Sequence, residues 1–167
     1  MRVLGVDIGT TGAKALVIDE TGAVLGQGYS EYGLQTAPGG QVTQHAADWK
    51  NGMIAAVRGA LDQAGDGVQA IGLSTQGASM AACANVAEAD LVYTWMDGRA
   101  TAQTDRLAQT VGSDAVYRAT GWPLSPGGDA AKVLWLRENG ALRGDEKFVS
   151  TLGYINHFLT EIGRAHV

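Results

Sequence analysis

The alternation of hydrophobic and polar residues in the first part of the chain predicts β-strands. An unbroken apolar run at 3–6 is typical of a buried strand, and segments at 13–19 and 23–29 fit two more. Only short turns rich in Gly and Thr separate these segments, so the three strands are expected to form an antiparallel meander. Residues 33–42, with one Pro followed by two Gly, are expected to form a loop.

From about residue 48 the hydrophobic period becomes that of an α-helix. Over 48–64 the apolar residues share one helical face, and Gly65 marks the expected end. This face consists of Trp49, Met53, Ala56, Val57, Ala60, Leu61 and Ala64. Further strands are expected at 68–73 and 80–84, and further helices at 99–111, 114–120, 130–139 and 154–160. The order of elements predicts an α/β fold with helices packed on a mixed sheet.

Composition narrows the functional class. The chain has 167 residues, 46% of them hydrophobic, which suits one domain with a buried core. A net charge of −5 without a basic block argues against nucleic-acid binding. No apolar run reaches membrane-spanning length, so no membrane partner is expected.

Cysteine usage and the start of the chain suggest the compartment. Cys83 is the single cysteine, which rules out an internal disulfide, and its apolar neighbours predict a buried side chain. No cleavable signal precedes the first strand. We therefore expect a cytoplasmic protein.

The turn after the first strand carries the most informative chemistry. Asp7 ends that strand, where its carboxylate can face Mg²⁺ and the waters of the ion. Glycines allow the turn backbone to approach a polyanion, while hydroxyls and a lysine supply donors and positive charge. The residues concerned are Gly9, Thr10, Thr11, Gly12 and Lys14.

This turn matches neither common phosphate-binding motif. A Walker A loop and a Rossmann turn are both followed by a helix, whereas a strand follows here. The sequence therefore predicts a phosphate site built on a β-hairpin. Asp and Gly are also favoured in ordinary turns, so these residues alone leave a purely structural turn open.

Later segments resemble one family, in the same order as in that family. They are AIGLSTQ at 70–76, TWMDGRA at 94–100, TGWPLSP at 120–126 with AKVLWL at 131–136, and STLGYINHFLT at 150–160. With the first hairpin, they make residues 1 to about 160 resemble the FGGY carbohydrate kinases. The resemblance implies the ribonuclease H-like fold shared by actin and sugar kinases.

The resemblance also implies an activity and its cofactors. It implies an ATP-dependent kinase of a sugar or polyol, with a ketose such as a pentulose as the default substrate. In this reading Asp7 holds Mg²⁺, directly or through water, and the hairpin from Gly9 to Lys14 lines the phosphate site of ATP. The family's catalytic base is an aspartate in a second, C-terminal domain that this sequence lacks, together with the adenine site. The chain alone is therefore expected to be inactive, and the resemblance allows a homodimer of the full-length protein.

The sugar site implied by the resemblance draws on three segments. Gln76, Gly77 and Ala78 form the turn that enters the sugar pocket. Trp95 packs either against the apolar face of the sugar or in the core. Asp97 and Arg99 form either a structural ion pair or a substrate contact. Asp129 is either a carboxylate that accepts sugar hydroxyls or the N-cap of the following helix.

Two departures from the family pattern bear on specificity. Gly77 and Ala78 stand where glycerol and xylulose kinases carry larger side chains, and Gly127 and Gly128 replace bulky residues. We interpret both changes as a roomier pocket, which puts glycerol and simple xylulose specificity in doubt.

The remaining aromatic and histidine residues are expected to be structural. Trp49, Trp122 and Trp135 are interpreted as packing residues, and His157 as a structural residue in the last helix. His45 is interpreted as a solvated loop residue, because a lone histidine seldom binds a metal.

The sequence also allows two other interpretations. An actin-like or chaperone-like nucleotide switch would share the first hairpin but has no reason to carry the segments around Gln76 and Trp95. A truncated domain with an exposed apolar interface would aggregate. Residues 162–167 read like a translated sequencing adaptor, so we assign 1–161 to the domain and 162–167 to a non-native tail.

Overall fold

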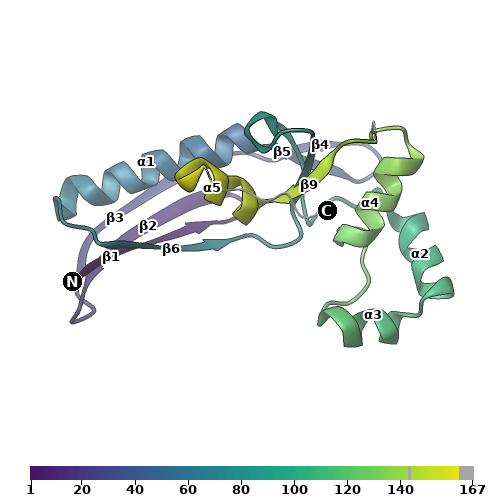
Figure 1. The fold of residues 1–167 in the computed structure, drawn as a ribbon, viewed down its shortest axis with the longest axis horizontal. Coiled ribbons are helices and arrows are strands. Elements are labelled where there is room, and N and C mark those ends of the chain that lie inside the picture. The colour runs from purple at the N-terminus through teal and green to yellow at the C-terminus, as the bar shows by residue number, and fades with distance from the viewer. Residues whose placement is uncertain (143, 162–167) are drawn as a thin grey trace.

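The computed structural model describes residues 1–142 and 144–161, which form two β-sheets bordered by helices (Figure 1). The first sheet is mixed and has the strand order β3-β2-β1-β6. Its strands are β1 (Arg2–Ile8), β2 (Gly12–Asp19), β3 (Val24–Glu31) and β6 (Ala70–Thr75). The predicted antiparallel meander of β1, β2 and β3 is confirmed, and β6 pairs parallel with β1.

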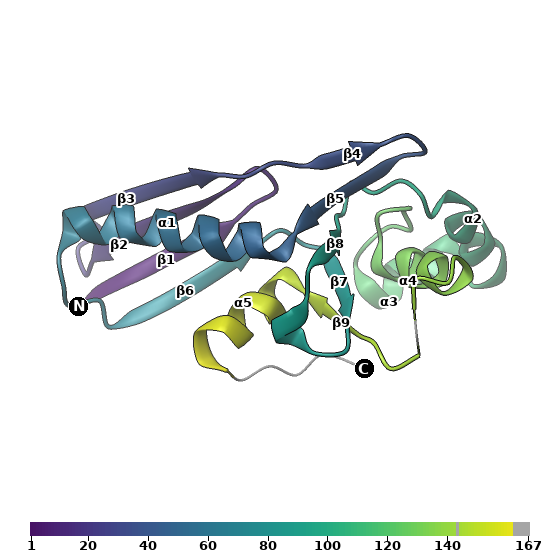
Figure 2. The same ribbon diagram turned by 90° about the horizontal axis from the view of Figure 1, so that it is seen from above.

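Helix α1 (Ala46–Ala64) covers one face of this sheet (Figure 2). Strand alternation points Leu4, Val6 and Ile8 toward the helix, and all three are buried. On β3 the approach is so close that a Cβ added at Gly28 would lie 1.9 Å from the Ala56 carbonyl oxygen. The apolar helix face predicted from the sequence is confirmed, with Trp49 only 1% exposed.

The opposite face of the sheet is open. It carries Asp7 and Gly5 of β1, Lys14 and Leu16 of β2, and Tyr29 of β3. These residues border a groove of about 970 Å³. Asp7 therefore lies at the end of a core strand with its side chain on the uncovered face.

The second sheet is antiparallel, with the order β4-β5-β8-β7-β9. Its strands are β4 (Gln35–Ala37), β5 (Gln41–His45), β7 (Met80–Cys83), β8 (Leu91–Tyr93) and β9 (Lys147–Ser150). The prediction of a loop over 33–42 is wrong, because β4 and β5 form a hairpin across it. The glycines marked as loop residues make its turn, at positive φ of 85° for Gly39 and 87° for Gly40.

The four other α-helices lie close to their predicted positions, and a 3-10 turn spans Val86–Glu88. They are α2 (Thr101–Thr110), α3 (Ser113–Thr120), α4 (Asp129–Glu138) and α5 (Thr151–Thr160). Helix α5 begins three residues before the expected start, because the Ser150 hydroxyl caps it by accepting from the Gly153 N–H. Over 1–142 and 144–161, no helix combines the length and apolarity needed to cross a membrane.

Individual packing predictions have mixed outcomes. Cys83 is buried as expected, and burial raises the pKa of its thiol. Trp122 is 72% exposed, so its assignment as a packing residue is wrong. The interpretation of His45 as a loop residue is wrong, because His45 ends β5, and its Nδ1 lies 2.9 Å from an Asp90 carboxylate oxygen.

Candidate functional site

The first hairpin places Asp7 and Lys14 directly opposite each other on β1 and β2. The Gly9 N–H donates to the Gly12 carbonyl over 3.0 Å and closes the turn. Tyr32 supports the turn from β3's end, because its hydroxyl donates to the Gly9 carbonyl over 2.7 Å. Burial raises the pKa of Tyr32, with a further contribution from the Asp7 carboxylate, so this hydroxyl stays a donor.

The residues of this turn fit a magnesium–phosphate ligand. Within 1–142 and 144–161 no three acidic, His or Cys side chains gather into a metal cluster, so Asp7 is a single carboxylate facing the groove. One carboxylate completed by phosphate oxygens and water is a usual environment for Mg²⁺. Thr11 and Lys14 are exposed beside it and can reach an anion.

Thr10 points elsewhere. Its hydroxyl donates to Gln76 Oε1 over 3.4 Å and accepts from the Trp95 indole N–H over 3.0 Å. The first hairpin, which the sequence assigned to phosphate binding, is thus in direct hydrogen-bond contact with two residues that the sequence assigned to the sugar site.

The turn after β6 carries Gln76, Gly77 and Ala78. Because β6 is parallel to β1, this turn emerges beside the first hairpin, and the Gln76 N–H donates to the Ile8 carbonyl over 2.8 Å. Ala78 has a positive φ of 49°, a strained conformation for a residue with a Cβ. A Cβ at Gly77 would meet nothing within 4 Å, so this position does leave open space.

Trp95 follows β8 at the rim of the same region and is 50% exposed. Its backbone N–H donates to the Ser79 hydroxyl over 3.1 Å, in addition to the indole contact with Thr10. A half-exposed tryptophan whose indole N–H and backbone N–H are both hydrogen-bonded is suited to stacking on the apolar face of a sugar. The alternative that Trp95 lies in the core is not supported.

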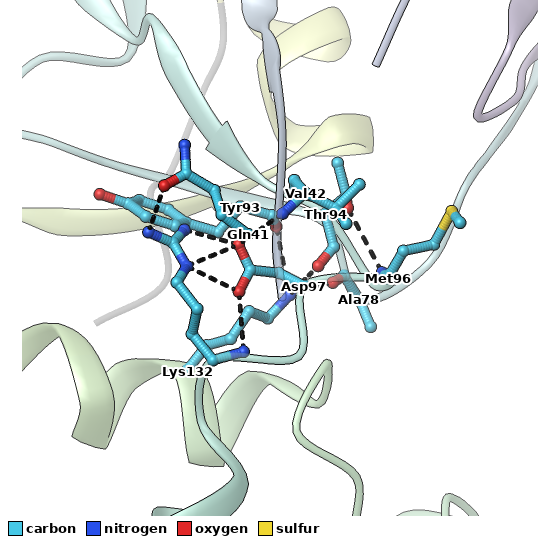
Figure 3. A network of polar contacts seen from close by, with 9 residues as sticks. Gln41, Val42, Ala78, Tyr93, Thr94, Met96, Asp97 and Lys132 are labelled. Atoms are coloured by element: carbon cyan, nitrogen blue, oxygen red, sulfur yellow. Dashed lines mark hydrogen bonds and ion pairs between the residues drawn. The ribbon is translucent and has the colours of Figure 1, made fainter. Parts of the chain in front are cut away.

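Asp97, labelled in Figure 3, forms a largely buried ion pair with Arg99. Asp97 is 2% exposed, and its Oδ2 lies 2.5 Å from Arg99 Nη2 and 3.3 Å from the Val42 N–H nitrogen. The guanidinium also stacks over the rings of Tyr93 and Trp135, 5.3 Å and 4.5 Å from their centroids. With both charges occupied in this way, the geometry favours the structural ion pair over a substrate contact.

The interpretation that Gly127 makes the pocket roomier is wrong. A Cβ there would lie 1.8 Å from the Trp95 carbonyl oxygen, so the Trp95 backbone already fills the space of a side chain. Gly127 therefore serves the close approach of two chain segments and adds no volume for a ligand.

Asp129 begins α4, and the N-cap position belongs to Gly128, so the predicted cap at Asp129 is wrong by one residue. The Asp129 side chain is 60% exposed, and its Oδ1 lies 3.7 Å from Lys132 Nζ. Its carboxylate faces solvent, outside the hydrogen-bond network of Thr10, Gln76 and Trp95.

Lys132 supports the candidate site from below, a role that the sequence analysis did not assign. It is 3% exposed, and Nζ donates to the Ala78 carbonyl, to that of Tyr93 over 3.2 Å and to that of Thr94 over 3.4 Å (Figure 3). One ammonium thus ties the strained Ala78 turn to the end of β8. In the sequence analysis Lys132 appears only as part of the AKVLWL segment of the family resemblance, with no role assigned to it.

Substituting Lys132 by methionine should change the pH dependence of stability. Burial lowers the pKa of Lys132 to about 8, against the opposing effect of Asp129 and Asp97. Between pH 8 and the ordinary 10.5 the unfolded chain then binds more protons than the folded one, so this residue adds stability as pH rises. The unfolding free energy of the wild type minus that of Lys132→Met should climb by up to about 1.4 kcal/mol per pH unit.

Urea denaturation of both chains at several pH values from 7 to about 10 measures this difference. The tyrosines titrate in both chains, so the subtraction removes their effect. A difference that stays constant or falls with pH would contradict the assignment.

This geometry defines a class of protein. A mixed sheet that opens with an antiparallel meander, backed by one helix and bearing a Gly/Thr hairpin beside an aspartate, is the ribonuclease H-like arrangement of the actin and sugar-kinase fold. The chain belongs to the FGGY family of carbohydrate kinases, since residues 2–167 match the N-terminal domain of that family.

Individual relatives agree with this assignment. The chain is 28% identical to a xylulose kinase from Haemophilus influenzae over 94% of its own length and 34% of the relative. It is 29% identical to a glycerol kinase from Trichlorobacter lovleyi, over 94% of the chain and 33% of the relative. A crystal structure of a xyloylose kinase from Brucella ovis superposes with a TM-score of 0.80 and 26% identity, over 94% of this chain and 34% of that one.

The chain spans about a third of the length of the curated relatives that it matches. The expectation of a non-native tail concerns 162–167, which lie outside the described residues.

Proposed function

We propose that this chain is the N-terminal, sugar-binding part of a kinase that transfers the γ-phosphoryl group of ATP to a hydroxyl of a ketose or related polyol. The observation that carries this proposal is the direct contact between the two halves of the site, in which Thr10 of the phosphate hairpin hydrogen-bonds Gln76 and Trp95. Phosphoryl transfer depends on the placement of an acceptor hydroxyl beside the phosphate, and this contact joins the elements that would do so.

The residues of the hairpin have separate roles in this proposal. Asp7 holds Mg²⁺, which when bound neutralises charge on the phosphates of ATP. Thr11, Lys14 and the turn glycines Gly9 and Gly12 contact the phosphates from the open face of the sheet. Gly12 is required by packing, since a Cβ there would lie 2.7 Å from the Ser30 carbonyl oxygen.

The sugar binds, in this proposal, between the Gln76–Gly77–Ala78 turn and the exposed face of Trp95. Gly77 provides open space, and Asp97 with Arg99 fixes the backbone of the segment that carries Trp95. Asp129, which is exposed at the start of α4, is retained in this proposal as a carboxylate that accepts sugar hydroxyls. We place the catalytic base and the adenine site in a second domain, and the protein in the cytoplasm.

A nucleotide switch without sugar kinase activity is the weaker alternative. Such a protein needs the hairpin, but it has no use for an exposed tryptophan held at both ends beside the Gln76 turn. The FGGY match over residues 2–167 also favours the kinase.

Sequencing the source DNA past the codon of Glu161 is the first test. The proposal requires a reading frame that continues into a second domain with its own phosphate turn and an aspartate suited to act as base. That full-length protein should release ADP only when a sugar or polyol from a panel is present. ATP turnover that no sugar stimulates would favour the nucleotide switch.

Trp95→Phe should raise the KM for the sugar by about tenfold in the full-length protein and change kcat less, because stacking acts on the bound sugar and on the transition state alike. Steady-state kinetics measures both constants. Trp122→Phe is the matched control, because Trp122 is 72% exposed and has no role in the proposed site. Equal changes in the sugar KM for the two substitutions would show that Trp95 does not contact the sugar.

A further inference from the structure

Gln44, the fourth residue of β5, lies beneath both parts of the candidate site and is 1% exposed. Its side-chain amide makes four hydrogen bonds. Nε2 donates to the Thr10 carbonyl over 2.7 Å and to the Gly33 carbonyl over 3.1 Å. Oε1 accepts from the Trp49 indole N–H and from Gln76 Nε2, each over 3.0 Å. The full hydrogen-bonding capacity of an amide is used, so the side chain has one orientation.

The direction of each bond is fixed by chemistry. The Trp49 indole can only donate, so the atom facing it must be the oxygen of Gln44. Gln44 Oε1 then requires a donor from Gln76, which leaves Gln76 Oε1 to accept from the hydroxyls of Thr10 and Ser79, over 3.4 Å and 3.1 Å.

The other end of the network is fixed in the same way. The indole N–H of Trp95 donates to the Thr10 hydroxyl, and the backbone N–H of Trp95 donates to the Ser79 hydroxyl. Both hydroxyls must therefore donate toward Gln76 Oε1, which is the direction that the orientation of Gln44 imposes. Because the indole N–H groups of Trp49 and Trp95 can only donate, the hydrogen bonds between them have one possible set of directions.

We propose that Gln44 is a positioning residue that locks the phosphate hairpin and the sugar turn into one register, by holding the Thr10 carbonyl and the Gln76 amide at the same time. The kinetic part of this inference rests on the proposed kinase function. The structural part does not, because it concerns the order of Thr10, Gln76 and Trp95 in this chain.

The indole N–H resonances of the four tryptophans test the structural part directly in the 167-residue chain. Gln44→Met removes all four hydrogen bonds at similar side-chain length. Trp49 loses its direct partner, and Trp95, which does not touch Gln44, should also shift and exchange its indole proton about tenfold faster. Trp122 and Trp135 should be unchanged.

Gln63→Met is the matched control. Gln63 also donates to two carbonyls, those of Gln27 and Gly59, but it lies far along α1 and is exposed. It should leave the Trp95 resonance in place. An unchanged Trp95 resonance in Gln44→Met would overturn the proposal.

If Gln44→Met unfolds the chain, all four indole resonances shift and the variant no longer tests the coupling. A variant at the other end of the network then tests it. Thr10→Val removes only the hydroxyl at the far end of the network. The proposal requires a shift of the Trp49 indole in this variant, transmitted through Gln76 and Gln44. A Trp49 resonance identical to that of the wild type refutes the coupling.

In the full-length enzyme, Gln44→Met should lower kcat by about a hundredfold and raise the sugar KM less than about threefold, since misplacement of bound groups slows transfer more than it weakens binding. Gln44→Glu should regain part of this kcat as pH falls, because a protonated carboxyl can again donate to the Thr10 carbonyl. Equal losses of kcat in Gln63→Met would contradict a positioning role. Absence of any kinase activity in the wild type would instead refute the proposed function and leave the resonance test standing.

Discussion

Replacement of Asp7 by alanine is expected to lower kcat of the full-length enzyme by about a thousandfold or more, while sugar affinity changes little. Asp7 lies on the open face of the sheet, directly opposite Lys14, and contributes the single carboxylate that borders the groove in the described residues. In the proposed function, loss of that carboxylate removes the ligand for Mg²⁺ and with it the charge neutralisation that phosphoryl transfer requires. Initial rates with saturating sugar, together with sugar titration monitored by calorimetry, measure the two quantities separately.

The control for this experiment is Asp62→Ala, which removes an exposed carboxylate from the outer face of α1. It should leave kcat within about twofold, as most exposed substitutions remote from a site do. If Asp7→Ala loses sugar binding as well as kcat, Asp7 belongs to the sugar site and not to the phosphate site.

Gly28→Ala is expected to destabilise the fold by about 3 kcal/mol or more. The added methyl group would lie 1.9 Å from the Ala56 carbonyl oxygen and 2.8 Å from its carbon, both backbone atoms of a helix that cannot move alone. Helix α1 would have to separate from β3, which opens the core around Trp49. Chemical denaturation followed by far-UV circular dichroism measures the change in the free energy of unfolding.

Gly72→Ala is the matched control in the same sheet. Gly72 lies in β6, where an added Cβ meets nothing within 4 Å. This substitution should change stability by less than about 0.5 kcal/mol. Similar losses for both glycines would mean that the helix does not press on β3 as described.

Local patterns were sufficient to predict much of the fold. The meander of β1, β2 and β3 and the helix α1 were readable because each has a clear hydrophobic period and short connections. Of the second sheet, only β7 was predicted, as the strand expected at 80–84. Its strands β4 and β8 have three residues each, too few to show alternation, and β5 is largely polar.

The candidate site was also predictable only in part. The hairpin from Asp7 to Lys14 could be found because its residue types are unusual together at that spacing. Gln44 and Lys132 could not be found, because a glutamine and a lysine are common surface residues. Their importance follows from near-complete burial and from the backbone carbonyls of Thr10 and Ala78 that they hold.

The sequence by itself determined the α/β class, the meander, the first hairpin and the family to which the chain belongs, because these depend on residues that are neighbours along the chain. Only the tertiary structure decided that the chain forms two sheets, that Gly127 adds no space, and that Asp97 and Arg99 form a structural ion pair. The two sheets depend on pairing between strands far apart in the sequence, Gly127 depends on the approach of its segment to Trp95, and the Asp97–Arg99 pair depends on its packing against Trp135 and Val42. Such meetings leave no periodic signal in the chain, since they are set by how the elements pack.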